Sequence, residues 1–271
     1  MHVKIPVVGV VGYKNSGKTT VIERIVQELT KRQYRVATVK HIPQKGFSMD
    51  IKGKDTWRHS VAGANPVVSI SDAEMAVLSK NGETKFSLDH LSRFTPEIDV
   101  IVLEGFSRMV LDDENVGKIL CVRKREEYED FKEKTKGEII ASCSTPHIGS
   151  PILRIKEDSQ ILVRQALRYI KRKQKISKIL SRLLGLNCGK CGYLSCEEMA
   201  VAIYKRKAKL DDCVTLRLRS KLKTRITLND VEVPIQLFVS EIIRNSVLGM
   251  VSSLKGVSIG GNEEIRIEIL S

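Results

Sequence analysis

The sequence predicts an α/β protein whose first domain is built on a mostly parallel sheet. A small helical domain with four cysteines follows, and a C-terminal ββαβ module ends the chain. Three observations support this prediction. A glycine-rich loop at residues 12–19 separates a strand-like run from a helix-like run, strand-like and helix-like segments alternate up to about residue 158, and four cysteines lie between residues 188 and 213.

The loop at residues 12–19 reads GYKNSGKT and satisfies the pattern G-x-x-x-x-G-K-[ST]. It lies between the strand-like run Val7–Val11 and the helix-like run Thr20–Leu29, the context in which the pattern predicts a P-loop NTPase domain. Glycines let backbone N–H groups turn inward, and the helix points its positive end at the same place. The residues that we expect to hold a nucleotide are Gly12, Asn15, Ser16, Gly17, Lys18, Thr19 and Thr20.

Two side chains of this loop have specific expected roles: Lys18 can reach the β- and γ-phosphates, and the Thr19 hydroxyl can ligate Mg²⁺. The chain continues with further strand-like runs. The most apolar of them ends in Glu104, which we expect to be the second acid on the magnesium side, acting directly or through water. The runs are Arg35–His41, Pro66–Ile70, Glu74–Leu78, Asp99–Gly105, Lys118–Val122 and Gly137–Ser142.

Four pieces of sequence occur in one order and spacing that together resemble the molybdopterin-guanine dinucleotide biosynthesis protein B family. The pieces are Asn15–Thr20, Thr38–His41, Gly53–Thr56 with Ala62–Ala64, and Leu103–Phe106. The resemblance covers residues 1 to about 158. It implies a GTP-binding accessory protein that serves the nucleotide-attachment step of molybdenum or tungsten cofactor maturation. Its partner would be a cofactor nucleotidyltransferase or a molybdoenzyme, and related nucleotide-binding proteins suggest a homodimer.

The same resemblance assigns phosphate and metal binding to Gly12, Gly17, Lys18 and Thr19, and it places Asp50 and Glu104 near the magnesium ion. Lys18 and Glu104 are then the candidate catalytic residues of a GTPase. We expect hydrolysis to be slow, because the sequence identifies no water-positioning glutamine and no arginine finger. The guanine-reading tetrapeptide N-K-x-D is absent, so the preference for GTP follows from the resemblance alone.

The second motif is C-x2-C-x4-C-x16-C, formed by Cys188, Cys191, Cys196 and Cys213. Six cysteines in a cytoplasmic chain do not predict disulfides, and both zinc and an iron–sulfur cluster accept four thiolates. The string resembles the small 4Fe–4S domain of corrinoid iron–sulfur proteins, which favours a 4Fe–4S cluster over zinc. Ser195 and Glu198 predict a capping box at the start of a short helix over residues 197–209. The isolated Cys121 and Cys143 are predicted to be small core residues.

The net charge of +14 comes from residues 159–225, which hold 18 Lys and Arg against 4 Asp and Glu. Residues 159–184 predict a basic helix. A solvated face is the usual explanation of such a run, and an acidic partner, an anionic cofactor and nucleic acid are the alternatives. Aromatic residues that could stack on bases are scarce here, which argues against nucleic acid. No apolar run is long enough to cross a membrane and the chain starts directly with a strand-like run, so we expect a cytoplasmic protein.

The predicted divisions are a P-loop domain at 1–158, a basic linker helix at 159–186, an iron–sulfur domain at 187–220 and a small α+β module at 221–271. In the last, a hairpin turns at Asn229-Asp230, a helix stops near Gly256, and Glu264–Leu270 alternates as a strand. Other function classes stay open. They are a nucleotide-gated iron–sulfur, redox or metallocentre maturation protein, a small-molecule kinase, and a nucleic-acid adaptor.

Overall fold

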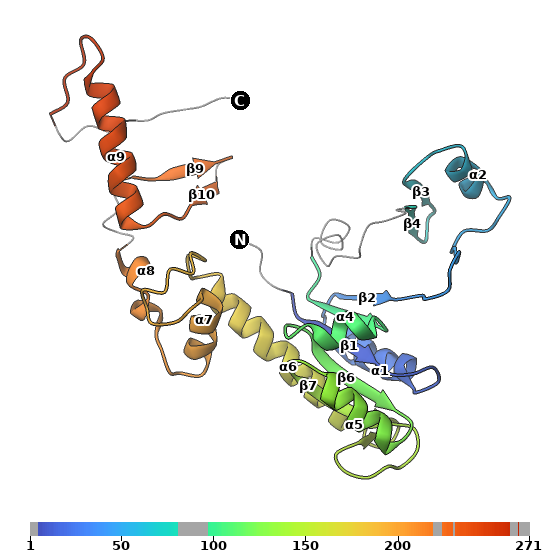
Figure 1. Ribbon diagram of the computed structural model, residues 1–271. Helices are drawn as coiled ribbons and strands as arrows, with labels where there is room; N and C mark the ends of the chain where they lie inside the picture. Colours follow the sequence, from blue (N-terminus) through green and yellow to red (C-terminus); the bar gives the residue numbers. More distant parts are fainter. Residues whose placement is uncertain (1–4, 81–96, 219–223, 230, 261–264, 266–271) are drawn as a thin grey trace. The chain divides into compact units, whose positions relative to one another are not determined.

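The computed structural model describes residues 5–80, 97–218, 224–229, 231–260 and 265. Residues 5–170 form one compact unit, and the chain from residue 171 belongs to a second. Helix α6 (Ser159–Leu180) begins in the first unit and ends in the second (Figure 1). Among the described residues, no helix combines the length and apolarity that a membrane span requires.

The first unit is built on a six-stranded sheet in the order β2-β5-β1-β6-β7-β8, in which all neighbouring strands are parallel. This confirms the predicted α/β class. The apolar run β1 lies in the middle of the sheet, where both of its faces are covered, and all five of its residues are buried. The strands are β1 (Val7–Val11), β2 (Val36–Lys40), β5 (Val100–Glu104), β6 (Gly117–Val122), β7 (Ile139–Ser144) and β8 (Leu153–Arg154).

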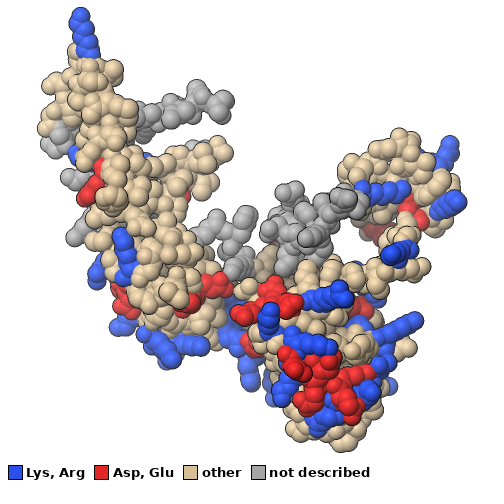
Figure 2. Space-filling view, viewed as in Figure 1, with Lys and Arg blue, Asp and Glu red and all other residues tan. Residues whose placement is uncertain are grey.

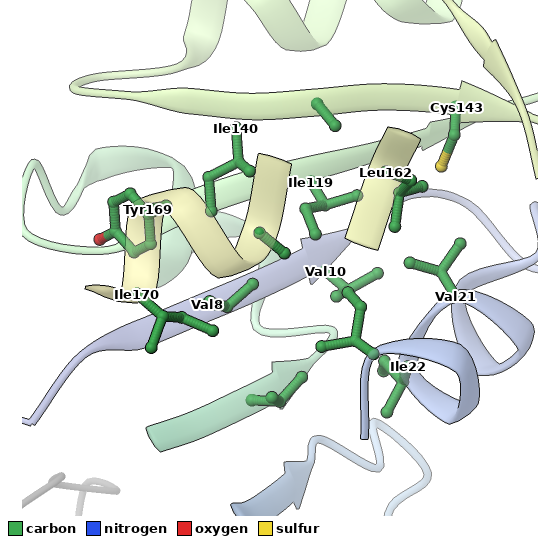
Figure 3. Packing of buried hydrophobic residues seen from close by; sticks show 14 of the residues in the cluster. Val8, Val10, Val21, Ile22, Ile119, Ile140, Cys143, Leu162, Tyr169 and Ile170 are labelled. Carbon is green, nitrogen blue, oxygen red and sulfur yellow. The ribbon is translucent and has the colours of Figure 1, made fainter. Parts of the chain in front are cut away.

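Helices cover both faces of this sheet. Because side chains alternate along a strand, Val8 and Val10 pack on one face, with α1 (Lys18–Lys31) and the first half of α6 (Figure 3). Val7 and Val11 pack on the other face, with α4 (Ser107–Asp112) and α5 (Arg125–Lys134). The predicted helix-like run Thr20–Leu29 lies within α1, whose Ile22, Ile25 and Leu29 are buried. Cys121 and Cys143 are core residues, as predicted.

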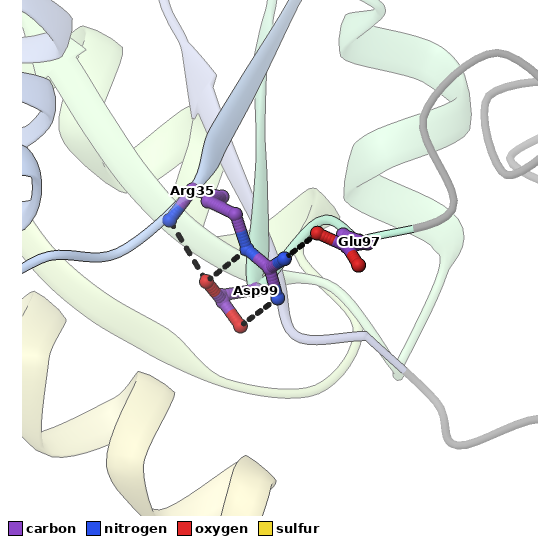
Figure 4. Close-up of polar contacts among 3 residues, drawn as sticks. All are labelled: Arg35, Glu97 and Asp99. Carbon is purple, nitrogen blue, oxygen red and sulfur yellow. Dashed lines mark hydrogen bonds and ion pairs between the residues drawn. The ribbon is translucent and has the colours of Figure 1, made fainter.

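A polar cluster joins the starts of β2 and β5. The backbone N–H of Arg35 donates to Asp99 Oδ2 (2.8 Å), and its Nε donates to the same oxygen (3.2 Å). The Arg35 guanidinium also pairs with Glu97 (Figure 4). This hydrogen bonding holds the pKa of the Asp99 carboxyl below its usual value. The cluster lies at the amino ends of the strands, so it fixes register without approaching the loop at residues 12–19.

The chain between β2 and β5 contains helix α2 (Asp55–Val61) and strands β3 (Val67–Ile70) and β4 (Met75–Leu78). Both strands were predicted. They pair with each other antiparallel in a separate two-stranded sheet and do not join the parallel one. Each is short and partly exposed, whereas a central strand of a parallel sheet is an apolar run buried on both faces.

The second unit contains a small core around Leu183, Met199, Ala200 and Cys213. It is formed by the end of α6, helix α7 (Cys196–Tyr204), a 3₁₀ turn (Leu210–Asp212) and α8 (Val214–Leu218). Further along the chain, β9 (Ile226–Leu228) and β10 (Val231–Val233) pair antiparallel and are followed by α9 (Leu237–Ser252). The predicted hairpin and helix are therefore present. The predicted strand Glu264–Leu270 lies outside the described residues except for Ile265.

Candidate nucleotide site and four-cysteine centre

The loop at residues 12–19 leaves the buried end of β1 and enters α1 at Lys18. It is packed closely at two of its glycines. A Cβ on Gly12 would lie 2.1 Å from the backbone carbonyl oxygen of Cys121. Gly17 precedes the helix at φ 87°, in the left-handed region, and a Cβ there would lie 2.3 Å from Ile155 Cδ1. The first N–H groups of α1, which have no partner within the helix, therefore lie at a tightly packed turn.

Lys18 folds back over this turn. Its Nζ donates to the carbonyl oxygens of Gly12 (3.0 Å) and Tyr13 (2.7 Å), so its ammonium group lies across the loop. Ser16 is only 1% exposed, and its Oγ has no hydrogen-bond partner among the described residues. Asn15, Thr19 and Thr20 are exposed on the same loop. The loop thus presents lysine ammonium groups, exposed hydroxyls and backbone amides, which are the groups that bind phosphate.

Glu104 is the acid that the fold brings to the loop. β1 and β5 are adjacent and parallel, so their carboxyl ends meet at one edge of the sheet. Thr19 Oγ1 lies 3.2 Å from Glu104 Oε1 and donates to it, and Lys40 Nζ lies 3.3 Å from the same oxygen. The Glu104 side chain is 15% exposed, so it is partly buried but reachable. The structure therefore brings Glu104 to Thr19, which lies 85 positions earlier in the sequence and directly follows Lys18.

Asp50 has a different environment. Its Oδ1 accepts hydrogen bonds from Thr56 Oγ1 (2.7 Å) and from the backbone N–H of Ile51 (2.9 Å). These contacts are local, and they shape the segment that leads into α2. The hydrogen bonds and ion pairs described for Asp50 do not include Thr19 or Glu104, so the arrangement at the loop is formed without it.

Sequence reasoning missed the groups that support the outer side of the loop. The Tyr13 ring lies 5.2 Å from the Phe131 ring, and the Arg123 guanidinium carbon lies 5.5 Å from the Tyr13 centroid. Glu127 is 5% exposed and accepts from Arg123 Nε (2.9 Å) and from its backbone N–H (2.9 Å). Hydrogen bonding to Arg123 lowers the pKa of Glu127. The i, i+4 spacing of Arg123 and Glu127 was the available signal.

Lys40 was also missed as a partner of Glu104. The sequence places Lys40 in the piece Thr38–His41 and assigns it no role. In the structure it is the last residue of β2 and pairs in register with Glu104, the last residue of β5. The signal for this contact is the position of both residues at the ends of predicted strands, because parallel strands end at the same edge of a sheet.

The four cysteines of the second motif belong to the small core of the second unit. Cys213 is buried, and Cys191 and Cys196 pack against the same cluster. Cys188 Sγ lies 3.2 Å from Thr215 Oγ1, a hydrogen bond that lowers the pKa of this thiol. Burial raises the pKa of Cys213. In the part of the chain that the structure describes, no three His, Cys, Asp or Glu side chains converge in a geometry that would hold a metal ion.

The donor set and the backbone around these thiols nevertheless suit a metal centre. Ser195 caps α7, because its Oγ accepts from the Glu198 N–H (3.1 Å). The return bond of the predicted capping box goes one residue earlier than expected, from the Leu194 N–H to Glu198 Oε2 (3.0 Å). The Cys196 N–H donates to Asn187 Oδ1 (2.9 Å). The loop that bears three of the thiols is therefore held at both ends, and its two glycines leave open space around it.

Comparison with known proteins addresses both regions. The family model described as "MobB: Molybdopterin guanine dinucleotide synthesis protein B" matches residues 7–145. A relative from Methanocaldococcus jannaschii, named "Putative molybdopterin-guanine dinucleotide biosynthesis adapter protein", is 30% identical over 263 residues and 97% of each chain. The chain belongs to the MobB family. A second model, "Putative Fe-S cluster", matches residues 183–215 of this MobB-family chain.

Shorter relatives align with the first part of the chain. The adapter protein of Haemophilus influenzae is 35% identical over 125 residues, which are 45% of this chain and 66% of that protein. A crystal structure of molybdopterin-guanine biosynthesis protein B is 28% identical with a TM-score of 0.45, covering 61% of this chain and 99% of its own. A crystal structure of Bacillus subtilis MobB is 27% identical with a TM-score of 0.47, and the match covers 61% of this chain and 98% of that chain. The MobB membership predicted from the four sequence pieces is confirmed.

Proposed function

We propose that this MobB-family chain is a nucleotide-dependent adapter in molybdopterin guanine dinucleotide biosynthesis that binds magnesium–GTP at residues 12–20. The observation that carries the proposal is the meeting of Lys18, Thr19 and Glu104 at the carboxyl edge of the parallel sheet. This edge is where open α/β sheets bind their ligands. The names of the relatives, which describe adapter proteins of this pathway, support the biological role.

The residues of the loop fit a magnesium nucleotide. Lys18 is held on two carbonyl oxygens, so it can exchange them for phosphate oxygens with little movement of its stem. The Thr19 hydroxyl and the Glu104 carboxylate offer the hard oxygen ligands that Mg²⁺ requires, and Lys40 offsets part of the carboxylate charge. When bound, the ion would neutralise charge on the phosphates. Asp50 is a further candidate ligand, and its Oδ1 accepts two local hydrogen bonds.

Titration calorimetry with magnesium–GTP tests the nucleotide site. Lys18→Ala removes charge-assisted hydrogen bonds worth about 1.5–3 kcal/mol each, so affinity should fall about 100-fold or more. The matched control is Lys14→Ala, which removes an exposed lysine from the same loop and should change affinity less than about threefold. Equal affinity in the parent and Lys18→Ala, or equal losses in the two variants, would contradict the proposal. The same titration with ATP measures the base preference.

We further propose that Cys188, Cys191, Cys196 and Cys213 carry a 4Fe–4S cluster. The match to an iron–sulfur family model supports this, as does the position of Cys191, Cys196 and Cys213 in one small core. Metal sites form together with local structure, so binding would draw the thiols into their final geometry. The cluster would supply a one-electron redox centre or a structural cross-link.

Anaerobic purification with iron analysis and a visible spectrum tests the cluster. We expect a brown protein with broad absorption that dithionite bleaches. Cys188→Ser should lose most of the iron, whereas the control Cys143→Ala, which alters a buried cysteine of the first unit, should keep it. A colourless protein with one zinc ion would show that the centre is a zinc site.

The functional division that we propose follows the sequence: a P-loop domain at 1–158, a linker helix at 159–186, a cluster domain at 187–220 and a small module at 221–271. Hydrolysis by Lys18 and Glu104 would be slow, and it would time the release of a nucleotidyltransferase or molybdoenzyme partner. Gel filtration with light scattering in the presence and absence of GTP tests whether the adapter works as a homodimer.

A further inference from the structure

Leu194 is 84% exposed, the highest exposure among the large apolar side chains of the described residues. Single exposed apolar residues are common and usually need no explanation. Leu194 differs because its backbone is fixed. Its N–H donates to Glu198 Oε2 (3.0 Å), and the turn before it is closed by a bond from the Gly192 N–H to the Gly189 carbonyl (2.9 Å). Because hydrogen bonds already hold the backbone here, a partner that covers Leu194 would order little further backbone.

The position of Leu194 connects it with the thiols. It lies in the loop Cys188–Cys196, two residues before Cys196 and three after Cys191. Tyr193, its neighbour, turns inward and packs against the small core. A molecule that covers Leu194 would therefore rest on the rim of the four-cysteine centre.

Cations surround this loop in the sequence of the second unit. Residues 171–213 hold eleven Lys and Arg against four Asp and Glu. Two of those acids are engaged in local bonds, because Glu198 binds the Leu194 N–H and Asp212 Oδ2 accepts from the Lys209 N–H (2.7 Å). Blue side chains project from the visible face of this part of the chain, among tan residues and some red ones (Figure 2). The exposed cations are Lys171, Lys175, Lys178, Arg182, Lys190, Lys205, Arg206, Lys207 and Lys209. We call these cations together with Leu194 the basic thiol-loop surface.

The chemistry of this surface fits an acidic protein better than nucleic acid or a membrane. Binding of single-stranded nucleic acid uses exposed aromatic rings, whereas the exposed anchor here is aliphatic and Tyr193 is packed inward. Membrane anchoring needs more apolar surface than one leucine, whose burial contributes about 1.5–3 kcal/mol. Weak electron-transfer complexes have small interfaces, and complementary charge makes such encounters salt-sensitive. One apolar anchor among cations fits an encounter of that kind.

We propose that the basic thiol-loop surface is the docking site of an acidic electron-transfer protein of the ferredoxin class. Cys188, Cys191, Cys196 and Cys213 would hold the proposed cluster, which would supply the acceptor for the one electron that reduced ferredoxin gives up; no covalent bond would form or break. The proposal rests on the proposed cluster, because the electron needs an acceptor at the rim where Leu194 lies. The lysines would accelerate the encounter by steering the acidic partner, and Leu194 would hold it over the centre.

Anaerobic titration calorimetry with the iron-loaded full chain tests the docking. The probes are two acidic ferredoxins, one of the [2Fe–2S] and one of the 2[4Fe–4S] type. We expect a weak complex that loses affinity at least tenfold between low and physiological salt. Leu194→Ser should weaken it about tenfold, since about 1.4 kcal/mol of apolar burial is lost, and Lys190→Glu should weaken it by a similar factor. Matched controls in the last module, Leu254→Ser and Lys255→Glu, should leave the affinity unchanged.

Three results would overturn the docking site: no binding of either ferredoxin, equal losses in the controls, or retention of the chain by anionic vesicles or by RNA but not by ferredoxin. The iron content and visible spectrum of every variant show whether the cluster is present, so loss of the docking site can be told from loss of the cluster. If the chain holds zinc, the electron transfer is wrong, and the effect of Leu194→Ser on ferredoxin binding then decides the docking site alone.

Discussion

Gly17→Ala tests how closely the nucleotide loop is packed against the rest of the first unit. The substitution has two costs. A residue with a Cβ at φ 87° loses about 1–2 kcal/mol relative to glycine. The new Cβ also lies 2.3 Å from Ile155 Cδ1, more than 1 Å inside ordinary contact. Ile155 is 5% exposed within the core cluster, so it cannot swing into solvent, and such overpacking costs about 1–3 kcal/mol.

Two variants separate these costs in equilibrium urea unfolding followed by circular dichroism. Gly53→Ala introduces a Cβ at φ 90° with no atom within 4 Å, so it should show at most the backbone cost. Ile155→Val alone should cost about 0.5–1.5 kcal/mol. Combined with Gly17→Ala, it removes the clashing Cδ1 and should recover about 1 kcal/mol or more of the loss. The packing argument would be refuted if Gly17→Ala lowered the free energy of unfolding no more than Gly53→Ala does. It would also be refuted if the losses of Gly17→Ala and Ile155→Val were strictly additive in the double variant.

Three further predictions concern stability. Glu127→Gln should lower the free energy of unfolding at pH 7 by about 1–2 kcal/mol. In the folded state Arg123 lowers the pKa of Glu127 below its usual 4.5, so the stability difference between variant and parent should shrink as pH falls below 4.5, and a difference independent of pH would contradict this assignment. Ser195→Ala removes the cap of α7 and should lower the thermal midpoint of the second unit by an amount equivalent to about 1 kcal/mol, with Ser195→Asn as the variant that retains the cap. Leu162→Ala opens a cavity between α6 and the sheet and should cost about 2–5 kcal/mol in urea unfolding, whereas Ile161→Ala, at an exposed neighbour, should cost less than about 1 kcal/mol.

The two candidate sites differ in how much of them is local in sequence. The loop at residues 12–19 is contiguous, so its glycines, Lys18 and Thr19 could be assigned from spacing alone. The motif C-x2-C-x4-C-x16-C is also compact, and three of its four cysteines belong to the small core. Glu104 could be predicted because parallel strands end at the same edge of a sheet, and the contact with Thr19 agrees with that expectation.

The remaining groups depend on contacts that no local pattern encodes. Lys40 reaches Glu104 because β2 pairs with β5, and that pairing is a matter of strand order. The stack of Tyr13 on Phe131 requires α5 to lie beside the loop. The requirement for glycine at position 17 comes partly from Ile155, which is 138 positions later in the chain.

The sequence by itself determined the class of the fold, the family and the two chemical motifs, because hydrophobic periodicity and motif spacing are local patterns within a contiguous segment. Only the tertiary structure decided which side chains support those motifs, that β3 and β4 form a separate hairpin, and that Leu194, in the loop that bears three of the thiols, faces solvent. These outcomes follow from packing and strand order, which depend on the whole chain and not on any one segment.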